Sequence, residues 1–469
     1  SEMCIRDRHF RFSVKAFRKK ISFFEKKTDS GQLFFENPLQ IFVDYDKIEN
    51  EESSLLSVLP VLYTEFGGRS VLKSAVSGYI IVSGMTPVLA ATGFGFALLL
   101  RSRLSQIIKE YRHMAKIRVA VLFGGVSSEH DVSLVSAENV IRSIPKEKYE
   151  VLCIGITKKG RWLYFPGDVS EISTGAWEQN PDCTAAILSP DPLHGGIVTI
   201  ENGETYIKKV DVVFPVLHGR NGEDGRLQGI MEMARIPYVG CGVLSSAVCM
   251  DKGMTHTVLD YNGIQTAKWA SVHQRDLNKL NEKCVAIAET LGFPLFVKPA
   301  NAGSSVGVSK ATDLESLKDA VQIAFTHDEK VIIEEFIDGR ELEVAVFGYD
   351  APIASYVGEI EPAAEFYDYD DKYVNGSSKL YIPARITDQE SDRIRETALR
   401  AYQALGCKGL SRVDFFLSKD GSIILNEINT LPGFTSISMY PKLMEHLGMK
   451  QEYLVDKLIE QAMENAART

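Results

Sequence analysis

The sequence has few of the features that mark a disulfide-stabilised or zinc-binding protein. Its 469 residues include 7 cysteines, an odd number, and no two of them form a Cys-x-x-Cys pair. Scattered cysteines of this kind are typical of a reducing compartment and argue against both a disulfide framework and a zinc site. Internal repeats and low-complexity tracts are also lacking. We therefore expect a cytoplasmic protein, whose length corresponds to roughly two to four domains.

A basic surface is the next missing feature. The net charge is −10, which argues against a general nucleic-acid binder. The charge is unevenly distributed, because residues 1–115 contain 16 Lys and Arg against 12 Asp and Glu, so this segment alone is basic. The remainder of the chain carries the whole negative excess.

The N-terminal segment differs from the rest in a second way. Residues 74–100 contain no charge and are long enough to span a bilayer, although Pro87 and several glycines weaken a helix there. A membrane anchor and a buried hairpin are two interpretations. We favour a third, because Met114 directly precedes a convincing first strand and the opening SEMCIRDR resembles translated sequencing-adapter sequence. On this interpretation residues 1–113 are an extension of doubtful origin, an upstream artefact.

From residue 116 onward the pattern is α/β. A strand at Val119–Phe123 runs into Gly124-Gly125 and a helix near 133–143, and further strands follow at Val151–Thr157 and Val210–Leu217. Such units predict an open, mostly parallel sheet, with ligands at the carboxyl ends of its strands. We expect three domains after the extension, at 114–251, 252–340 and 341–469.

A hairpin near the C-terminus is the most informative local pattern. SRVDFFL (411–417) and LNEINTLPGFTS (425–436) flank a turn at 419–421. Alternate residues of a strand share a face, so Arg412 and Asp414 point one way, as do Glu427 and Asn429. If the two faces coincide, three oxygen donors suited to Mg²⁺ meet beside a guanidinium. The alternative is a hairpin with a solvated acidic face.

Two segments of the middle domain indicate a nucleotide. LFVKPANAGSSVGVSK (295–310) places Lys298 before a Gly- and Ser-rich loop whose N–H groups could cradle phosphates, although it is not a Walker A loop. VIIEEFIDGRELEV (331–344) ends a strand in acids that could contact adenine and ribose. A surface hairpin and solvated acids are the respective alternatives.

Two further loops complete the set. FYDYDDKYVNGSS (366–378) combines aromatic and acidic residues in the manner of a lid that closes over a site, and its alternative is an ordinary surface loop. HGRNGEDGRLQG (218–229) has the glycine density of a backbone that approaches a ligand, and a lysine follows at 252.

Together these strings resemble the D-alanine–D-alanine ligases of the ATP-grasp superfamily, over about residues 116–465. GGVSSEHDVSL (124–134) and the MDK at 250–252 join the segments above in the family's order and spacing. The resemblance implies an ATP-grasp fold of two α+β subdomains, preceded by an open parallel-sheet domain. It implies that two D-alanines are joined through a D-alanyl phosphate for peptidoglycan synthesis, with ATP as substrate. It also implies a homodimer, and membrane association only if segment 74–100 is genuine.

The resemblance also assigns substrate and catalytic roles. Glu129 would hold the ammonium of the first D-alanine near His218, and Ser304 would bond to Glu129 and Tyr373. Arg412 and the Gly433 N–H would stabilise the oxyanion. Ser438, with Met439 beside it, would meet the carboxylate of the second D-alanine, although leucine is common at the latter position.

The remaining roles concern ATP and metal. The resemblance assigns ATP contacts to Lys252, Lys298, Ser304, Ser305, Glu334, Glu335, Ile337, Glu341 and Lys372. It assigns two Mg²⁺ ions, or Mn²⁺, to Asp414, Glu427 and Asn429. A D-alanine–D-lactate ligase is the nearest alternative, but Lys372 and Tyr373 match ligases that form the peptide bond. A non-catalytic, membrane-tethered nucleotide-binding protein is the alternative of a different class.

Overall fold

The computed structural model describes residues 116–304, 306–362 and 378–467, together with six short strands between residues 26 and 70. The chain divides into two compact units, Ser1–Glu110 and Tyr111–Thr469. Within the first unit three short antiparallel pairs are described: β1 (Lys26–Lys27) with β2 (Leu33–Phe34), β3 (Gln40–Phe42) with β4 (Val61–Tyr63), and β5 (Glu65–Phe66) with β6 (Arg69–Ser70). Segment 74–100 lies outside the described residues. Among those described, no helix is both long and apolar enough to cross a membrane.

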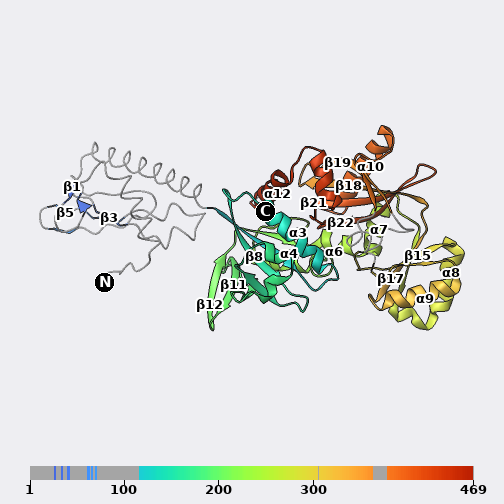
Figure 1. The fold of residues 1–469 in the computed structure, drawn as a ribbon, viewed down its shortest axis with the longest axis horizontal. Helices are drawn as coiled ribbons and strands as arrows, with labels where there is room; N and C mark the ends of the chain where they lie inside the picture. The colour runs from blue at the N-terminus through green and yellow to red at the C-terminus, as the bar shows by residue number, and fades with distance from the viewer. Residues whose placement is uncertain are drawn as a thin grey trace. The chain divides into compact units, whose positions relative to one another are not determined.

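The second unit begins with a seven-stranded sheet in the order β12-β11-β10-β9-β8-β7-β13 (Figure 1). Its strands are β7 (Ile117–Gly124), β8 (Tyr149–Ile156), β9 (Trp162–Phe165), β10 (Thr184–Leu188), β11 (Gly196–Glu201), β12 (Glu204–Lys209) and β13 (Val212–Val216). The helices that follow the parallel strands are α3 (His130–Ser143), α5 (Arg226–Ala234), α6 (Val243–Met250) and α7 (Lys252–Tyr261), with the short α4 (Ser170–Ser173) between β9 and β10.

The expectation of a mostly parallel sheet needs correction. Only β7 pairs in parallel, with β8 on one side and β13 on the other. The four strands from β9 to β12 pair antiparallel. The connections from β8 to β9, from β10 to β11 and from β11 to β12 are too short for a parallel crossover, whereas β9 and β10 are joined by a longer segment that contains α4. The parallel part is nevertheless the part that carries the expected ligand-binding ends, since Gly124 closes β7 and His218 follows β13.

Two antiparallel sheets follow. The four-stranded sheet β14-β17-β15-β16 consists of β14 (Trp269–His273), β15 (Leu295–Pro299), β16 (Ser309–Ala311) and β17 (Lys330–Glu335), with α8 (Leu280–Leu291) and α9 (Leu314–Phe325) packed on it. The five-stranded sheet β20-β19-β18-β21-β22 consists of β18 (Gly339–Gly348), β19 (Ile353–Glu361), β20 (Lys379–Tyr381), β21 (Gly409–Ser418) and β22 (Ile423–Asn429). Helices α10 (Asp388–Ala404), α11 (Met439–His446) and α12 (Gln451–Ala466) complete the chain.

The last helix packs on the first sheet. Leu454, Leu458 and Ile459 of α12 share a buried core with Val119 and Val121 of β7, and Figure 1 shows α12 beside α3. Polar contacts reinforce this packing, since the Tyr149 hydroxyl donates to Asp456 over 2.8 Å and Lys148 donates to the same carboxylate over 2.6 Å. The two ends of this unit therefore fold as one body, which holds the first sheet against the third.

Side-chain alternation places a group of polar residues on one face of each antiparallel sheet, although part of that face of the five-stranded sheet packs on α11. In the four-stranded sheet Val297 and Ile333 face α8 and α9, so Lys298 and Glu334 lie on the opposite face. In the five-stranded sheet Leu342, Val344, Val413 and Phe415 enter the core beside α10. The residues between them therefore point to the other face.

A bulge in β22 sets which residues meet on that face. Phe415 pairs with Leu425, but Asp414 pairs with Glu427 and Arg412 with Asn429, so Asn426 is the extra residue. Without the bulge, Asp414 would lie opposite Asn426 and Arg412 opposite Ile428. The bulge therefore sends Leu425 and Ile428 into the core while it aligns the four predicted site residues on one face. This confirms that the two hairpin strands share a face.

A buried carboxylate ties β18 and β19 to the segment after β20. Glu359 is 2 % exposed and accepts two hydrogen bonds from the Arg340 side chain, at 3.0 and 2.6 Å. It accepts three more from Arg385, one from the backbone N–H and two from the guanidinium, at 3.0, 3.1 and 2.7 Å. Burial alone would raise the pKa of Glu359, but the bonds from Arg385 and Arg340 lower it to about 2.

We predict that Glu359→Gln lowers the free energy of unfolding by about 3 kcal/mol at neutral pH, because it leaves two arginines without their shared partner. The native pKa lies below the ordinary value of 4.5, so the pairing stabilises the fold above that pH. This contribution is lost as the pH falls from about 4.5 toward 2, and the difference between wild type and variant should shrink over that window. Denaturant unfolding at a series of pH values measures it.

Glu361→Gln is the matched control. Glu361 also pairs with Arg385, at 2.8 Å, but its side chain is 41 % exposed. Its loss should change the unfolding midpoint far less. Equal effects of the two substitutions would show that the buried pairs of Glu359 contribute no more to the free energy of unfolding than the exposed pair of Glu361.

Candidate active site

Glu129 lies where the first sheet meets the loop after β15. It stands at the N-terminus of α3, is 7 % exposed, and accepts a hydrogen bond from the Ser304 hydroxyl. Glycines make this approach possible, since a Cβ atom at Gly219 or Gly303 would lie only 2.6 or 2.8 Å from Glu129 Oε2. The expected hydrogen bond between Ser304 and Glu129 is therefore present, and it joins two segments that are 175 residues apart.

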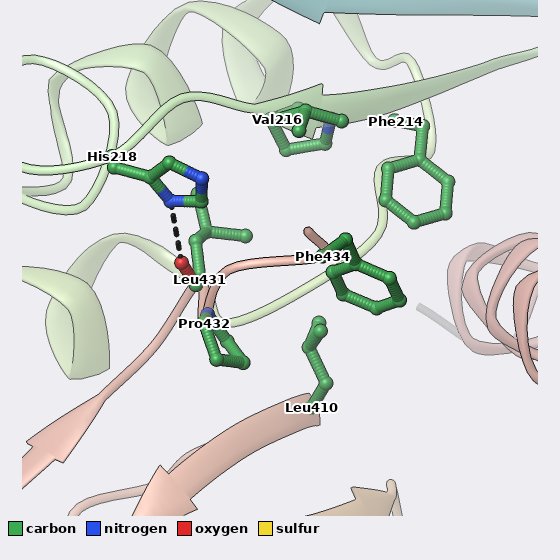
Figure 2. A pocket seen from close by; sticks show the side chains of 8 residues that line it. Phe214, Val216, His218, Leu410, Leu431, Pro432 and Phe434 are labelled. Carbon is green, nitrogen blue, oxygen red and sulfur yellow. Dashed lines mark hydrogen bonds between the residues drawn. The ribbon is translucent and has the colours of Figure 1, made fainter. Parts of the chain in front are cut away.

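His218 joins the first sheet to the loop after β22. Its Nδ1 donates to the Leu431 carbonyl over 2.9 Å (Figure 2). Its Nε2 lies 3.2 Å from the Ser136 hydroxyl. Burial lowers the pKa of His218, the charge of Glu129 and the Leu431 carbonyl raise it, and the positive charge of Arg412 lowers it; the net shift is downward. We conclude that His218 is neutral and acts here as a hydrogen-bonding link.

A small cavity lies behind this link. Figure 2 shows Phe214 and Val216 on one side and Pro432 and Phe434 on the other. Its volume of about 10 Å³ is about that of a single water site, and its walls are apolar. A cavity of this size, which His218 also lines, cannot hold an amino-acid substrate.

Glu223 is a site residue that sequence reasoning missed. It accepts from the Gly219 N–H over 2.7 Å and from the Leu431 N–H over 2.9 Å. Burial and the nearby charge of Glu129 raise its pKa to about 8, whereas the two backbone donors lower it. His218 holds the carbonyl of Leu431 and Glu223 holds its N–H, so one residue of the C-terminal loop is held from two sides. The available signal was the GED string at 222–224, to which no role was assigned.

Lys298 and Glu334 form a buried ion pair on the polar face of the four-stranded sheet. Lys298 Nζ lies 2.7 Å from Glu334 Oε2 and 3.3 Å from Asn426 Oδ1, the bulge residue of β22. Burial would lower the pKa of Lys298, but the charge of Glu334 raises it overall. Burial likewise opposes the ionisation of Glu334, yet Lys298 holds its pKa at about 2. Both groups are therefore charged.

His256 is the second partner of Glu334 and was not predicted. Its Nε2 lies 3.0 Å from Glu334 Oε1 and donates to it, while its ring stacks on Trp269 with centroids 5.2 Å apart. Both Glu334 oxygens thus have protein partners. The cause is the register that places Lys298 and Glu334 on one face of adjacent strands. The adenine contact expected of Glu334 stays a prediction.

Lys252 connects the Gly- and Ser-rich loop to the hairpin. Its Nζ donates to the Ala302 carbonyl over 2.7 Å and lies 3.9 Å from Glu427 Oε2. Lys252 opens α7, whose N-cap is Asp251. Two lysines from different elements, Lys252 and Lys298, therefore approach the hairpin face.

The hairpin face itself contains one cation among acids. Arg412 donates to both oxygens of Asp414, at 2.7 Å each, and Asn429 Nδ2 donates to Asp414 Oδ2 over 2.9 Å. In the described part of the chain no three His, Cys, Asp or Glu side chains are grouped as a metal site. The predicted metal ligands are two carboxylates, Asp414 and Glu427, and one amide, Asn429. Their oxygens still fit Mg²⁺, which takes few protein ligands. In this structure the carboxylate of Asp414 is paired with Arg412.

The loop after the hairpin brings two more predicted residues together. A Cβ atom on Gly433 would lie 2.8 Å from the Ser438 hydroxyl, so the two are neighbours. That hydroxyl accepts from the Thr435 N–H over 3.0 Å. The side chain of Met439 is instead 4 % exposed and lies in the core beside Gly358. Its side chain does not join the polar cluster.

Several predicted residues lie at the margin of the polar cluster formed by Glu129, Lys298 and the hairpin face, and others are not among the residues that the structure describes. Glu335 is bonded to the Lys268 backbone over 2.9 Å, and Ile337 and Glu341 are half-buried around the turn into β18. The structure does not describe Ser305, Lys372 and Tyr373, so the contacts expected of them stay predictions.

Comparison with known proteins agrees with this arrangement. A family model described as "D-ala D-ala ligase N-terminus" matches residues 118–241, and one described as "D-ala D-ala ligase C-terminus" matches residues 258–460. Among solved structures, the VanG D-Ala:D-Ser ligase of Enterococcus faecalis is 43 % identical, with a TM-score of 0.68 over 74 % of this chain and 100 % of that one. The D-alanine-D-alanine ligase of Coxiella burnetii is 32 % identical, with a TM-score of 0.66 over 75 % and 97 %.

Relatives of known sequence agree as well. The D-alanine–D-alanine ligase of Caldicellulosiruptor bescii is 47 % identical over 353 residues, which cover 75 % of this chain and 96 % of that protein. The D-alanine–D-alanine ligase of Acetivibrio thermocellus is 49 % identical over 362 residues, covering 74 % and 96 %. The chain therefore belongs to the D-alanine–D-alanine ligase family.

Proposed function

We propose that the chain is an ATP-dependent ligase that joins two D-alanines into D-alanyl-D-alanine for peptidoglycan precursor synthesis. The observation that carries the proposal is the convergence of Glu129, Ser304 and Arg412 with two lysines at one polar cluster, in a member of this family. Family membership supports ATP as the energy source. A homodimer and a cytoplasmic location stay predictions.

The first half-reaction needs an anchored amino acid and a cationic phosphate site. Glu129 holds the ammonium of the first D-alanine. The carboxylate of this D-alanine then faces the nucleotide and attacks the γ-phosphoryl group. Lys298 and Lys252 bind phosphate oxygens and stabilise the charge that spreads over them. ADP leaves and a D-alanyl phosphate remains.

The second half-reaction forms the peptide bond. Ser438 binds the carboxylate of the second D-alanine, whose neutral amine attacks the acyl carbon. Arg412 and the Gly433 N–H donate to the oxyanion of the tetrahedral intermediate, a contribution often worth several kcal/mol. Collapse of the intermediate expels phosphate, and the amine loses a proton. His218 and Glu223 hold Leu431, and with it the loop that carries Gly433.

A divalent metal fits the oxygen donors of the hairpin. Asp414, Glu427 and Asn429 would hold Mg²⁺, either as one ion or as two, and Mn²⁺ would bind the same oxygens. When bound, the metal supplies positive charge at the transferred phosphoryl group. Asp414 would then share its carboxylate between the metal and its present donors, Arg412 and Asn429.

We predict that the purified chain releases phosphate from ATP only when D-alanine and Mg²⁺ are both present, and forms D-alanyl-D-alanine in equal amount. Chelation of the metal should abolish release. Absence of D-alanine-dependent phosphate release would reject the proposed function. Mass analysis of products with D-alanine, D-lactate and D-serine as competing acceptors distinguishes the peptide-forming ligase from the ester-forming alternative, and tests the acceptor named for the Enterococcus faecalis neighbour.

We predict that Glu129→Gln raises the KM for D-alanine by about 10- to 100-fold, because an amide cannot offer a charge to the substrate ammonium. The KM for ATP should stay within about twofold of the wild-type value. Steady-state kinetics with each substrate varied in turn measures both. Asp131→Asn is the control, because Asp131 lies on the same helix with a side chain 67 % exposed; a shift of equal size in this control would contradict the assignment.

We predict that Glu427→Ala lowers turnover by about 100-fold and raises the Mg²⁺ concentration needed for half-maximal activity, because a ligand oxygen is lost. The thermal midpoint should change little. A variant that unfolds would instead show a structural role for Glu427. Glu445→Ala, an exposed acid on α11, serves as control and should keep the wild-type Mg²⁺ dependence.

A further inference from the structure

A buried acid, Glu343, has no role in the predicted site but lies beside the hairpin face of Arg412, Asp414, Glu427 and Asn429. Glu343 is on β18, directly opposite Asp414 of β21, so the two side chains share a face. Asp414 is in turn opposite Glu427 of β22. Glu343, Asp414 and Glu427 thus form one row across three adjacent strands, and Arg412 and Asn429 form part of the next row.

Glu343 reaches the guanidinium of Arg412. Arg412 Nε donates its one hydrogen to Asp414 Oδ1 over 2.7 Å, and it lies 3.1 Å from Glu343 Oε2 as an ion pair without hydrogen-bond geometry. Ala345, the residue opposite Arg412 on β18, is small and fully buried, which leaves room for the guanidinium to lie over it toward both acids. Glu343 itself is 5 % exposed, so solvent does not screen this contact appreciably.

Arg412 therefore pairs with two carboxylates, and one of them, Asp414, also belongs to the predicted metal ligands. Both Asp414 oxygens bond to Arg412, and Oδ2 also accepts from Asn429. If Asp414 turns to a metal, Arg412 loses part of that pairing. Glu343 lies on the inner strand of the sheet, has no place in the expected metal set, and can keep its contact with Nε.

We propose that Glu343 is a positioning residue that holds the Arg412 guanidinium toward the reacting carbonyl independently of Asp414. The inference rests on the proposed function, in which Arg412 stabilises the oxyanion. Removal of the Glu343 charge lets the guanidinium follow Asp414 away from that position. Misplacement of a catalytic group by about 1 Å can cost on the order of 100-fold in rate.

The test is a double-substitution cycle with Glu343→Gln and Arg412→Lys. Glu343→Gln alone should lower kcat by about 10- to 100-fold. In the Arg412→Lys background, which has already lost the guanidinium fork, the same change should lower kcat less than about threefold. Mn²⁺ affinity in the presence of ADP, measured by binding rather than by turnover, should stay within about twofold of wild type.

Glu359→Gln is the matched control, because Glu359 is an equally buried acid of the same sheet that bonds to other arginines. Its effect on kcat should be the same in both Arg412 backgrounds. Thermal unfolding of all variants separates loss of fold from loss of positioning, and coupling between Glu343 and Arg412 in the unfolding midpoint is expected as well.

Three results would overturn the proposal: an unchanged kcat in Glu343→Gln, an equal loss in both Arg412 backgrounds, or weakened Mn²⁺ binding, which would make Glu343 a metal ligand. Failure of the proposed function is separate, because it appears in the wild-type chain as absent D-alanine-dependent phosphate release. The coupling in thermal unfolding would then still test whether Glu343 holds Arg412.

Discussion

The bulged pairing of β21 with β22 is the constraint on which the polar cluster depends. One extra residue, Asn426, shifts the pairing so that Glu427 and Asn429 lie opposite Asp414 and Arg412 while Leu425 and Ile428 both remain in the core. Asn426 also accepts from Lys298 on the neighbouring sheet. A single backbone irregularity therefore aligns the acids, keeps Leu425 and Ile428 in the hydrophobic core and contacts Lys298.

Contacts between distant segments hold this face against the first sheet. Ser304 bonds to Glu129, and His218 and Glu223 bond to the carbonyl and N–H of Leu431. Helix α12 packs its apolar side on β7, so the C-terminal segment supports the domain that begins the fold. These links mean that the first sheet, the loop after β15 and the loop after β22 cannot move independently without breaking hydrogen bonds.

Much of this arrangement could be predicted from sequence, for identifiable reasons. Period-two alternation in SRVDFFL and LNEIN correctly indicated a hairpin with one polar face, because alternation depends only on local geometry. The mixed pairing of the first sheet, the bulge at Asn426 and the row that includes Glu343 depend on register between strands, which local pattern does not encode. His256 and Glu223 were missed for the same reason, since each acquires its role from a partner that is distant in sequence.

The pairing of buried cations with acids explains how such a cluster is stable before substrates bind. Lys298 has Glu334, and Arg412 has Asp414 and Glu343. An unpaired buried charge would cost several kcal/mol, so each cation needs a protein anion when no ligand is bound. Because the partners are fixed by strand register, the cations are already oriented when the ligand enters, and little further ordering is needed. Arg412 is shared between Asp414 and Glu343. Asp414 can therefore change its partner while Glu343 keeps the guanidinium in place.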